Sequence, residues 1–106
     1  MSLVVLMLMF DRYSAEARVI YDIYSNIRSA NPGMEELEAL FHLAERRYPG
    51  WSQDRVLELV AGKDIESLIL IILIQENQIN PISDWQLYRA VRRRVARVAR
   101  KKGNST

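Results

Sequence analysis

The residues best suited to binding chemistry gather near the C-terminus, where residues 84–106 hold eight basic side chains against one acid. These basic residues are Arg89, Arg92, Arg93, Arg94, Arg97, Arg100, Lys101 and Lys102. The segment therefore has a net charge of +7, whereas residues 1–83, with seven basic and twelve acidic residues, have −5. Guanidinium and ammonium groups pair with phosphates and carboxylates, so this segment predicts contact with an acidic partner.

The spacing of these cations suggests one particular partner. Arg89, Arg93, Arg97 and Arg100 recur at intervals of four and three residues, which places them in one row on a helix. The helix would be about 28 Å long and could follow a phosphate backbone. We therefore predict a nucleic-acid-binding surface that reads little base sequence. Two alternatives stay open: a plain solvated face with cations suited to a helix C-terminus, or neutralisation of the cations by the acidic body.

The single histidine, His42, is the other candidate for site chemistry. On a helix, Glu38 and Glu45 lie four residues before it and three residues after it, and share its face. Carboxylate-bridged bundles place a Glu-x-x-His pair on each of two helices, together with further glutamates. This chain has one histidine and a different spacing, so we expect a polar helix edge with a Glu–His pair and no metal site.

The remaining residues offer few candidates for catalysis. The chain has no cysteine, and its four glycines form no Gly-rich phosphate loop. A serine or threonine nucleophile would have only His42 as a base. We therefore expect a non-enzymatic protein with no cofactor and no small-molecule substrate. The absence of cysteine fits a reducing compartment, and we expect a cytoplasmic protein.

The basic row needs a docked helix to hold it, and the pattern predicts one over 83–102. Ser83 is expected as the N-cap, and Gln86 completes a capping box three residues later. Ile82 and Leu87 are expected to form a hydrophobic staple. An apolar seam would dock this helix on the body, and consists of Trp85, Tyr88, Val91, Val95 and Val98.

Two helices are predicted in the first half of the chain. The first lies within 14–30, with Ser14 as its N-cap and a stripe formed by Tyr13, Ala17, Ile20, Tyr24 and Ile27. It ends before Asn31-Pro32, because the residue before proline avoids the helical region. The second helix starts there, with Asn31 as its cap and Pro32 at its first position, and runs to Tyr48.

Two more helices are predicted between these and the basic helix. Ser52 caps a short one over 53–61 that Gly62 ends. Asp64 caps the next, over 65–78, whose centre Leu68–Ile74 is apolar on every side and must be surrounded by other elements. The β-branched isoleucines of that centre keep a buried strand open as the alternative.

The N-terminal run Leu3–Phe10 is continuously apolar. Its eight residues are far fewer than the roughly 20 of a membrane span, and no basic segment precedes it as in a signal peptide. It is either a short strand, which could pair across a dimer, or the first turns of a helix. The seam of the basic helix ends in valine and alanine without tryptophan or phenylalanine, so we also expect no contact with a membrane.

Together these elements predict an all-α fold, with about five helices packed around the apolar helix 65–78. We expect the 106 residues to form a single compact domain, 1–106, with a disordered tail at 103–106. A chain of this length buries a limited share of its surface, and its apolar content is 49%, so we expect a homodimer.

Residues 65–94, IESLILIILIQENQINPISDWQLYRAVRRR, resemble the opening of a winged helix–turn–helix domain. The matching features are an apolar first helix, a short proline-containing link and the pattern Trp85-x-Leu87-Tyr88-x-x-Val91. PadR-like transcription regulators have a similar run, and the resemblance implies DNA binding. A recognition helix and a β-wing, which the winged fold places next, are absent from these 106 residues, so no base-reading residue is carried over.

Two functions from different classes are therefore expected. The leading one is a small non-enzymatic nucleic-acid-binding protein that contacts the phosphate backbone through its basic C-terminal helix. The alternative is a homodimeric protein–protein interaction module whose basic helix packs on an acidic surface of its partner. They differ in whether the basic row is open to solvent or covered by acidic side chains.

Overall fold

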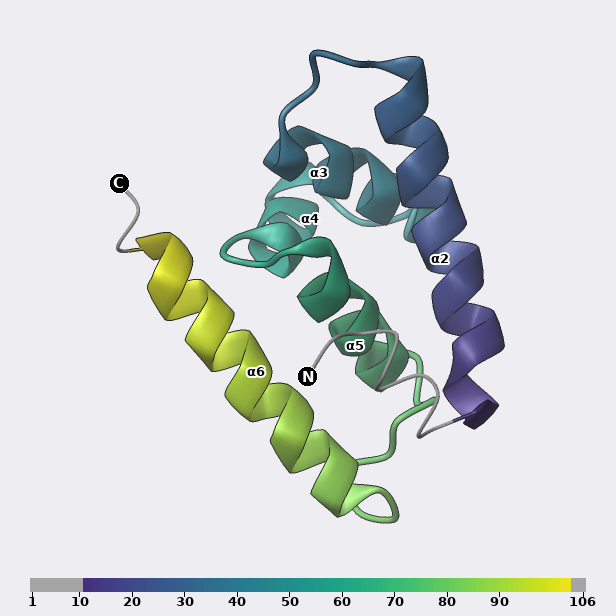
Figure 1. Cartoon of the computed structure of the whole chain (residues 1–106), viewed down its shortest axis with the longest axis vertical. Helices are drawn as coiled ribbons and strands as arrows, with labels where there is room; N and C mark the ends of the chain where they lie inside the picture. The colour runs from purple at the N-terminus through teal and green to yellow at the C-terminus, as the bar shows by residue number, and fades with distance from the viewer. Residues whose placement is uncertain (1–10, 104–106) are drawn as a thin grey trace.

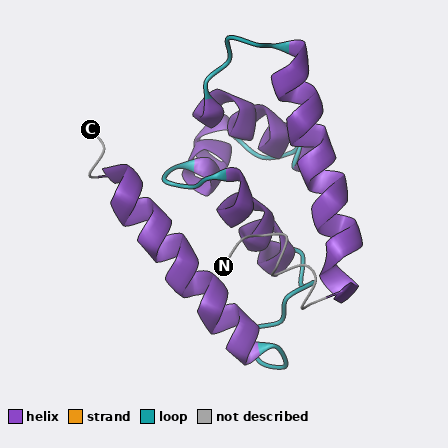
Figure 2. Cartoon of the chain, viewed as in Figure 1, coloured by secondary structure: helices purple, strands orange, loops and turns teal. Residues whose placement is uncertain are grey.

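The computed structural model describes residues 11–103, which form helices and the loops between them (Figure 1 and Figure 2). The helices are α2 (Asp11–Ala30), α3 (Glu36–Arg47), α4 (Gln53–Val60), α5 (Ile65–Gln75) and α6 (Trp85–Gly103). The expected all-α fold is confirmed, and residues 11–103 contain no strand. The strand considered for residues 3–10 lies outside the described residues, as do 104–106. Gly103, expected in the tail, is the last residue of α6.

Helix α5 forms the centre of the domain. It lies between α2 and α6 and contacts both, while α3 packs on α2 and on α4 (Figure 1). Its buried residues cover most of its circumference and are Ser67, Leu68, Ile69, Leu70, Ile72 and Leu73. A helix that is apolar all round has to be enclosed by other elements, and the other helices supply that enclosure. The buried helix is therefore confirmed, and the strand alternative is wrong.

Two capping motifs set the ends of α5. At the start, the Asp64 carboxylate accepts a hydrogen bond of 2.7 Å from the Ser67 amide, which confirms the predicted cap. At the end, Asn77 adopts a left-handed conformation with φ of 60°. The Gln78 amide then bonds the Leu73 carbonyl and the Asn77 amide bonds the Ile74 carbonyl, a Schellman motif. The helix therefore stops at Gln75, three residues before the predicted end.

Ser67 is the one polar residue in the buried core of the described chain. Its side chain is 0% exposed, and its hydroxyl has no hydrogen-bond partner among residues 11–103. A buried hydroxyl without a partner loses its hydration and gains nothing in return.

Replacing Ser67 by alanine should therefore raise the free energy of unfolding by about 0.5–1.5 kcal/mol, because the orphan hydroxyl is removed and alanine is the better helix former. Urea unfolding followed by circular dichroism measures the change. The exposed Ser52, whose hydroxyl caps α4, is the matched control, and its replacement by alanine should lower the stability by about 1 kcal/mol. A loss of stability in Ser67→Ala would contradict the absence of a partner.

The junction between α2 and α3 differs from the prediction. Helix α2 spans Asp11–Ala30, so Ser14 lies within the helix and is not its N-cap. Asn31 closes α2 instead of opening α3, because its side-chain amide donates a bond of 2.9 Å to the Ile27 carbonyl. The Met34 amide bonds the Asn31 carbonyl across the Pro32-Gly33 turn, and α3 starts only at Glu36, after Glu35, whose side chain makes no capping bond.

The short helix α4 follows its prediction closely. The Ser52 hydroxyl accepts a bond of 3.2 Å from the Arg55 amide, and α4 ends at Val60, one residue before the predicted end. Gly62 has a φ of +72° and forms the turn into α5. The α6 helix passes close to this turn: a Cβ atom built on Gly62 would lie 3.5 Å from the Ala99 Cβ.

The start of α6 also differs from the prediction. The helix begins at Trp85, and the link before it is ordered by Asn80, whose side-chain oxygen accepts bonds from the Ile82 and Ser83 amides. The Asp84 carboxylate in turn accepts a bond of 2.9 Å from the Asn80 amide. The residue that directly precedes the helix is Asp84, so the predicted Ser83 cap is wrong. The predicted staple is wrong, because Ile82 is 86% exposed.

Candidate nucleic-acid interface

Helix α6 docks on the body through a narrow apolar seam. Leu87 and Val91 are buried, and Tyr88 and Val95 are partly buried against the core. Trp85, expected in the seam, is 49% exposed, and the Arg89 guanidinium lies 5.4 Å from the centroid of its ring. The seam is therefore shifted to the face that carries Leu87, and the opposite face of α6 is left in solvent.

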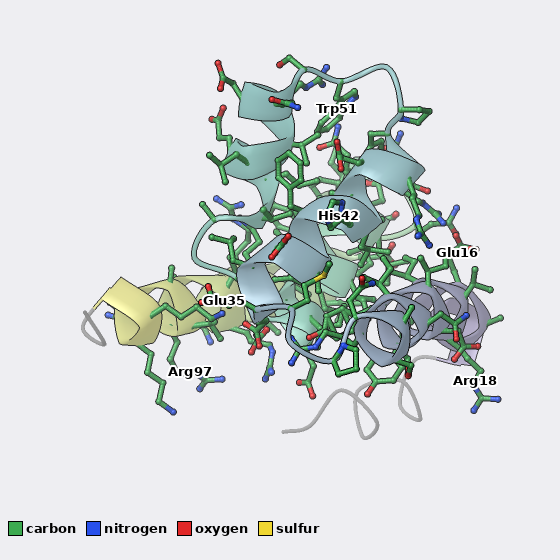
Figure 3. All side chains as sticks on the ribbon, turned by 90° about the horizontal axis from the view of Figure 1, so that it is seen from above. Glu16, Arg18, Glu35, His42, Trp51 and Arg97 are labelled. Atoms are coloured by element: carbon green, nitrogen blue, oxygen red, sulfur yellow. The ribbon has the colours of Figure 1, made fainter. Side chains whose placement is uncertain are left out.

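The predicted row lies on that solvent face. Arg89, Arg93, Arg97 and Arg100 are all exposed, and none of them makes an ion pair with any residue in the range 11–103. The Arg97 side chain extends away from the rest of the molecule (Figure 3). Lys101 is exposed as well. The row is thus presented as one strip of guanidinium groups along the helix.

Two of the eight predicted residues have a different role. The Arg94 guanidinium is 21% exposed, forms an ion pair with Glu66 and lies 3.9 Å from the Asp64 carboxylate. The Lys102 ammonium pairs with Glu36 at the start of α3. These contacts join α6 to the starts of α5 and α3, so Arg94 and Lys102 help to attach α6 to the body. The positive charge that faces solvent comes from the row.

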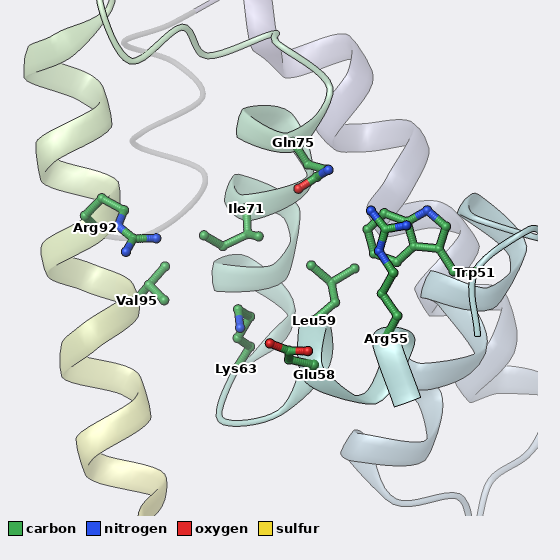
Figure 4. A pocket seen from close by; sticks show the side chains of 9 residues that line it. All are labelled: Trp51, Arg55, Glu58, Leu59, Lys63, Ile71, Gln75, Arg92 and Val95. Carbon is green, nitrogen blue, oxygen red and sulfur yellow. The ribbon is translucent and has the colours of Figure 1, made fainter. Parts of the chain in front are cut away.

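Arg92 occupies a third position, at the edge of a groove between α4, α5 and α6 (Figure 4). The groove has a volume of about 340 Å³. It is lined by Trp51, Arg55, Glu58, Leu59, Lys63, Ile71, Gln75, Arg92 and Val95. The cations Arg92, Lys63 and Arg55 come from three different segments, and the groove contains one acid, Glu58. No sequence pattern predicted this groove.

The surroundings of Lys63 in the groove disturb its ionisation. Burial lowers the pKa of its ammonium group, and the positive charge of Arg92 lowers it further, while Glu58 acts in the opposite direction. The ammonium has a long contact of 3.5 Å to the Ala61 carbonyl and no carboxylate within 4 Å in the described part of the chain. The charged form of Lys63 is therefore poorly compensated.

A stack of side chains forms one end of the groove. The Tyr48 and Trp51 rings are stacked with centroids 4.4 Å apart and planes 16° apart. The Arg55 guanidinium lies 3.6 Å from the Trp51 centroid. Trp51 is thus held between an aromatic ring and a cation, and the exposed guanidinium presents a flat polar surface to solvent.

Another polar cluster joins α2, α3 and the end of α5, and no sequence pattern predicted it. Arg47 of α3 donates two hydrogen bonds, of 2.7 and 2.6 Å, to the Glu76 carboxylate at the end of α5, and also pairs with Glu16 of α2. The Tyr48 hydroxyl donates a bond of 2.8 Å to the same Glu76 carboxylate. The cluster ties three helices together. In the sequence, Arg47 stood out only as a basic residue at the end of a predicted helix. The helix dipole alone accounts for a cation at that position, so the sequence offered no reason to expect partners for it.

The ionisation of this cluster follows from its bonds. Hydrogen bonds from Arg47 hold the pKa of Glu76 below its ordinary value of 4.5, against the opposing effect of burial. Burial raises the pKa of Tyr48, and its bond to Glu76 raises it further. Both shifts favour the state seen here, a carboxylate that accepts bonds from a guanidinium and a neutral phenol, so the cluster is structural at neutral pH.

His42 lies in the polar edge that the sequence predicted. Its Nδ1 is 3.1 Å from the Glu45 carboxylate, and its Nε2 is 3.9 Å from Glu38. Within residues 11–103, no group of three or more histidine or carboxylate side chains is arranged to hold a metal ion. The Glu–His pairs on α3 are confirmed.

Comparisons with known proteins give no relative for this chain: no family model, no curated protein and no solved structure matches it. In the part of the chain that the structure describes, no helix combines the length and the apolar character needed to cross a membrane.

Proposed function

We propose that this protein binds nucleic acid through the phosphate backbone, with the row Arg89, Arg93, Arg97 and Arg100 as the contact surface and without catalysing a reaction. The observation that carries the proposal is the exposure of all four guanidinium groups on the face of α6 opposite its seam. Successive members of the row are about 4.5–6 Å apart along the axis, and a guanidinium can bind a phosphate with two hydrogen bonds.

The two ion pairs of α6 support this proposal. A basic helix attached only by a few apolar side chains would turn its cations toward the acidic body. Here Glu66 and Glu36 already engage Arg94 and Lys102, which fixes the helix by its flank and keeps the row pointed outward. Backbone contact of this kind displaces counterions from the nucleic acid, so the affinity falls steeply as salt rises.

The double variant Arg93→Gln/Arg97→Gln should weaken binding about 10- to 100-fold at low salt and lower the slope of log K against log salt by about 2. Fluorescence anisotropy with labelled duplex and single-stranded oligonucleotides over a salt series measures both quantities. The matched control is Arg18→Gln/Arg46→Gln, which removes the same charge from exposed positions on α2 and α3. Figure 3 shows Arg18 on the far side of the molecule from Arg97. The control should bind within about twofold of the parent.

Two results would reject the proposal. One is the absence of binding at low salt. The other is an equal loss of affinity in both double variants, which would show that net charge matters and the row does not.

An interaction module is the second candidate, and a specific observation favours it. Ile82, in the link before α6, is 86% exposed, and Trp85, the first residue of α6, is 49% exposed and lies next to Arg89 of the basic row. Exposed apolar side chains beside a charged strip are typical of surfaces that bind proteins. Size-exclusion chromatography with light scattering tests the homodimer, and a monomer at high concentration would count against it.

A further inference from the structure

The groove between α4, α5 and α6 has the features of a small-ligand site. Its volume of about 340 Å³ falls at the lower end of the range of about 300–1,000 Å³ that is usual for such sites. Its floor is apolar and consists of Leu59, Ile71 and Val95 (Figure 4). Cations border this floor: Arg92 on the α6 side, Lys63 on the turn between α4 and α5, and Arg55 on α4.

Among the described residues, the two cations Lys63 and Arg92 form no ion pair with a carboxylate. They line the same groove from different segments, and neither has a carboxylate within 4 Å among residues 11–103. Their mutual repulsion, added to burial, lowers the pKa of Lys63. Glu58, the acid of the groove, makes no ion pair with either. An anion that entered between them would compensate both charges at once.

The rest of the groove indicates what else the ligand carries. The apolar floor would cover a flat hydrophobic group, and the Arg55 guanidinium, stacked on Trp51, offers a planar surface at the opposite end from Arg92. Guanidinium planes stack on aromatic rings and bases. The groove therefore combines two cations, of which Lys63 is also influenced by Glu58, with an apolar floor and a stacking end.

We propose that this groove binds a small phosphate ester with a planar body, of the nucleoside monophosphate class, with the phosphate between Lys63 and Arg92 and the planar group on the floor toward Arg55. A phosphate monoester has a charge of about −1.5 to −2 at neutral pH, which matches the two cations better than a single carboxylate does. The groove is separate from the outward row of α6, and its ligand does not depend on nucleic-acid binding.

The fluorescence of Trp51, which lines the groove, can report ligand binding. The chain has two tryptophans, so the variant Trp85→Phe leaves Trp51 as its only indole. In that background, titration with adenosine 5′-monophosphate should give a saturable change in Trp51 fluorescence. Lys63→Gln and Arg92→Gln should each weaken binding at least about tenfold, since a phosphate contact is lost. Lys63→Arg retains the charge and should bind within about threefold of the parent.

Controls separate this site from the basic row. Arg97→Gln, on the outward face, should leave the affinity within about twofold. Adenosine and inorganic phosphate should each bind much more weakly than the monophosphate, because each lacks one half of the recognised group. Saturation absent up to about 5 mM, equal affinity for adenosine, or an unchanged affinity in Lys63→Gln would each overturn the proposal.

Discussion

Replacing Ile72 by alanine should lower the free energy of unfolding by about 3–4 kcal/mol, the largest single effect expected in this domain. Ile72 is 0% exposed, in the middle of the central helix α5, which contacts both α2 and α6. Removing three carbon atoms there leaves a cavity that rigid neighbours cannot fill, so the loss includes both transfer energy and cavity energy. Domains are stable by about 5–15 kcal/mol, and the variant would retain only part of that.

Urea unfolding followed by circular dichroism tests this expectation. Ile82→Ala is the matched control, because it makes the same chemical change at a residue that is 86% exposed, and it should shift the stability by less than about 0.5 kcal/mol. Equal effects at the two positions would mean that α5 is not the enclosed centre of the fold.

Replacing Arg47 by methionine should lower the stability by about 2–3 kcal/mol at neutral pH, the second-largest effect. The variant keeps much of the side-chain volume but leaves the carboxylates of Glu76 and Glu16 without their guanidinium. Glu76 is only 28% exposed, so water replaces the lost bonds incompletely. Arg46→Met, at the neighbouring exposed position, should change the stability by less than about 0.5 kcal/mol.

The same variant has a defined pH dependence. The folded-state pKa of Glu76 is lowered from 4.5, so its contribution to stability is present above 4.5 and is lost as pH falls through the lowered value. The difference in stability between the parent and Arg47→Met should therefore stay constant from neutral pH down to 4.5 and narrow as the pH falls further. A difference that stayed constant with pH would show that Arg47 stabilises the fold by packing and not through the carboxylate of Glu76.

Local patterns predicted the elements of the fold well, because helices are decided largely by neighbours in sequence. The apolar run Leu68–Ile74 required burial, and the caps Ser52 and Asp64 bond amides three residues away, so both could be inferred from spacing. Asn31 could not be assigned in the same way. An asparagine beside proline can close one helix or open the next, and its side chain bonds backward to Ile27.

The contacts of the candidate site were less predictable, since they join residues far apart in the chain. Arg94 and Glu66 are 28 residues apart, and Lys102 and Glu36 are 66 apart. Nothing in the basic run distinguishes these two cations from the exposed row, and only the docking of α6 does so. The groove was unpredictable for the same reason: Lys63 and Arg92 are far apart in the chain and line one groove only because α4, α5 and α6 pack together.

The close approach of Gly62 and Ala99 has a consequence for the direction of the charged strip. Where α6 passes the turn between α4 and α5, the space left is that of a methyl group. A side chain larger than alanine at Gly62, where φ is +72°, would therefore meet α6 at Ala99. A bulkier side chain at Gly62 should therefore push the C-terminal half of α6 away from the body, and would change the direction of Arg97 and Arg100 without changing a single charge.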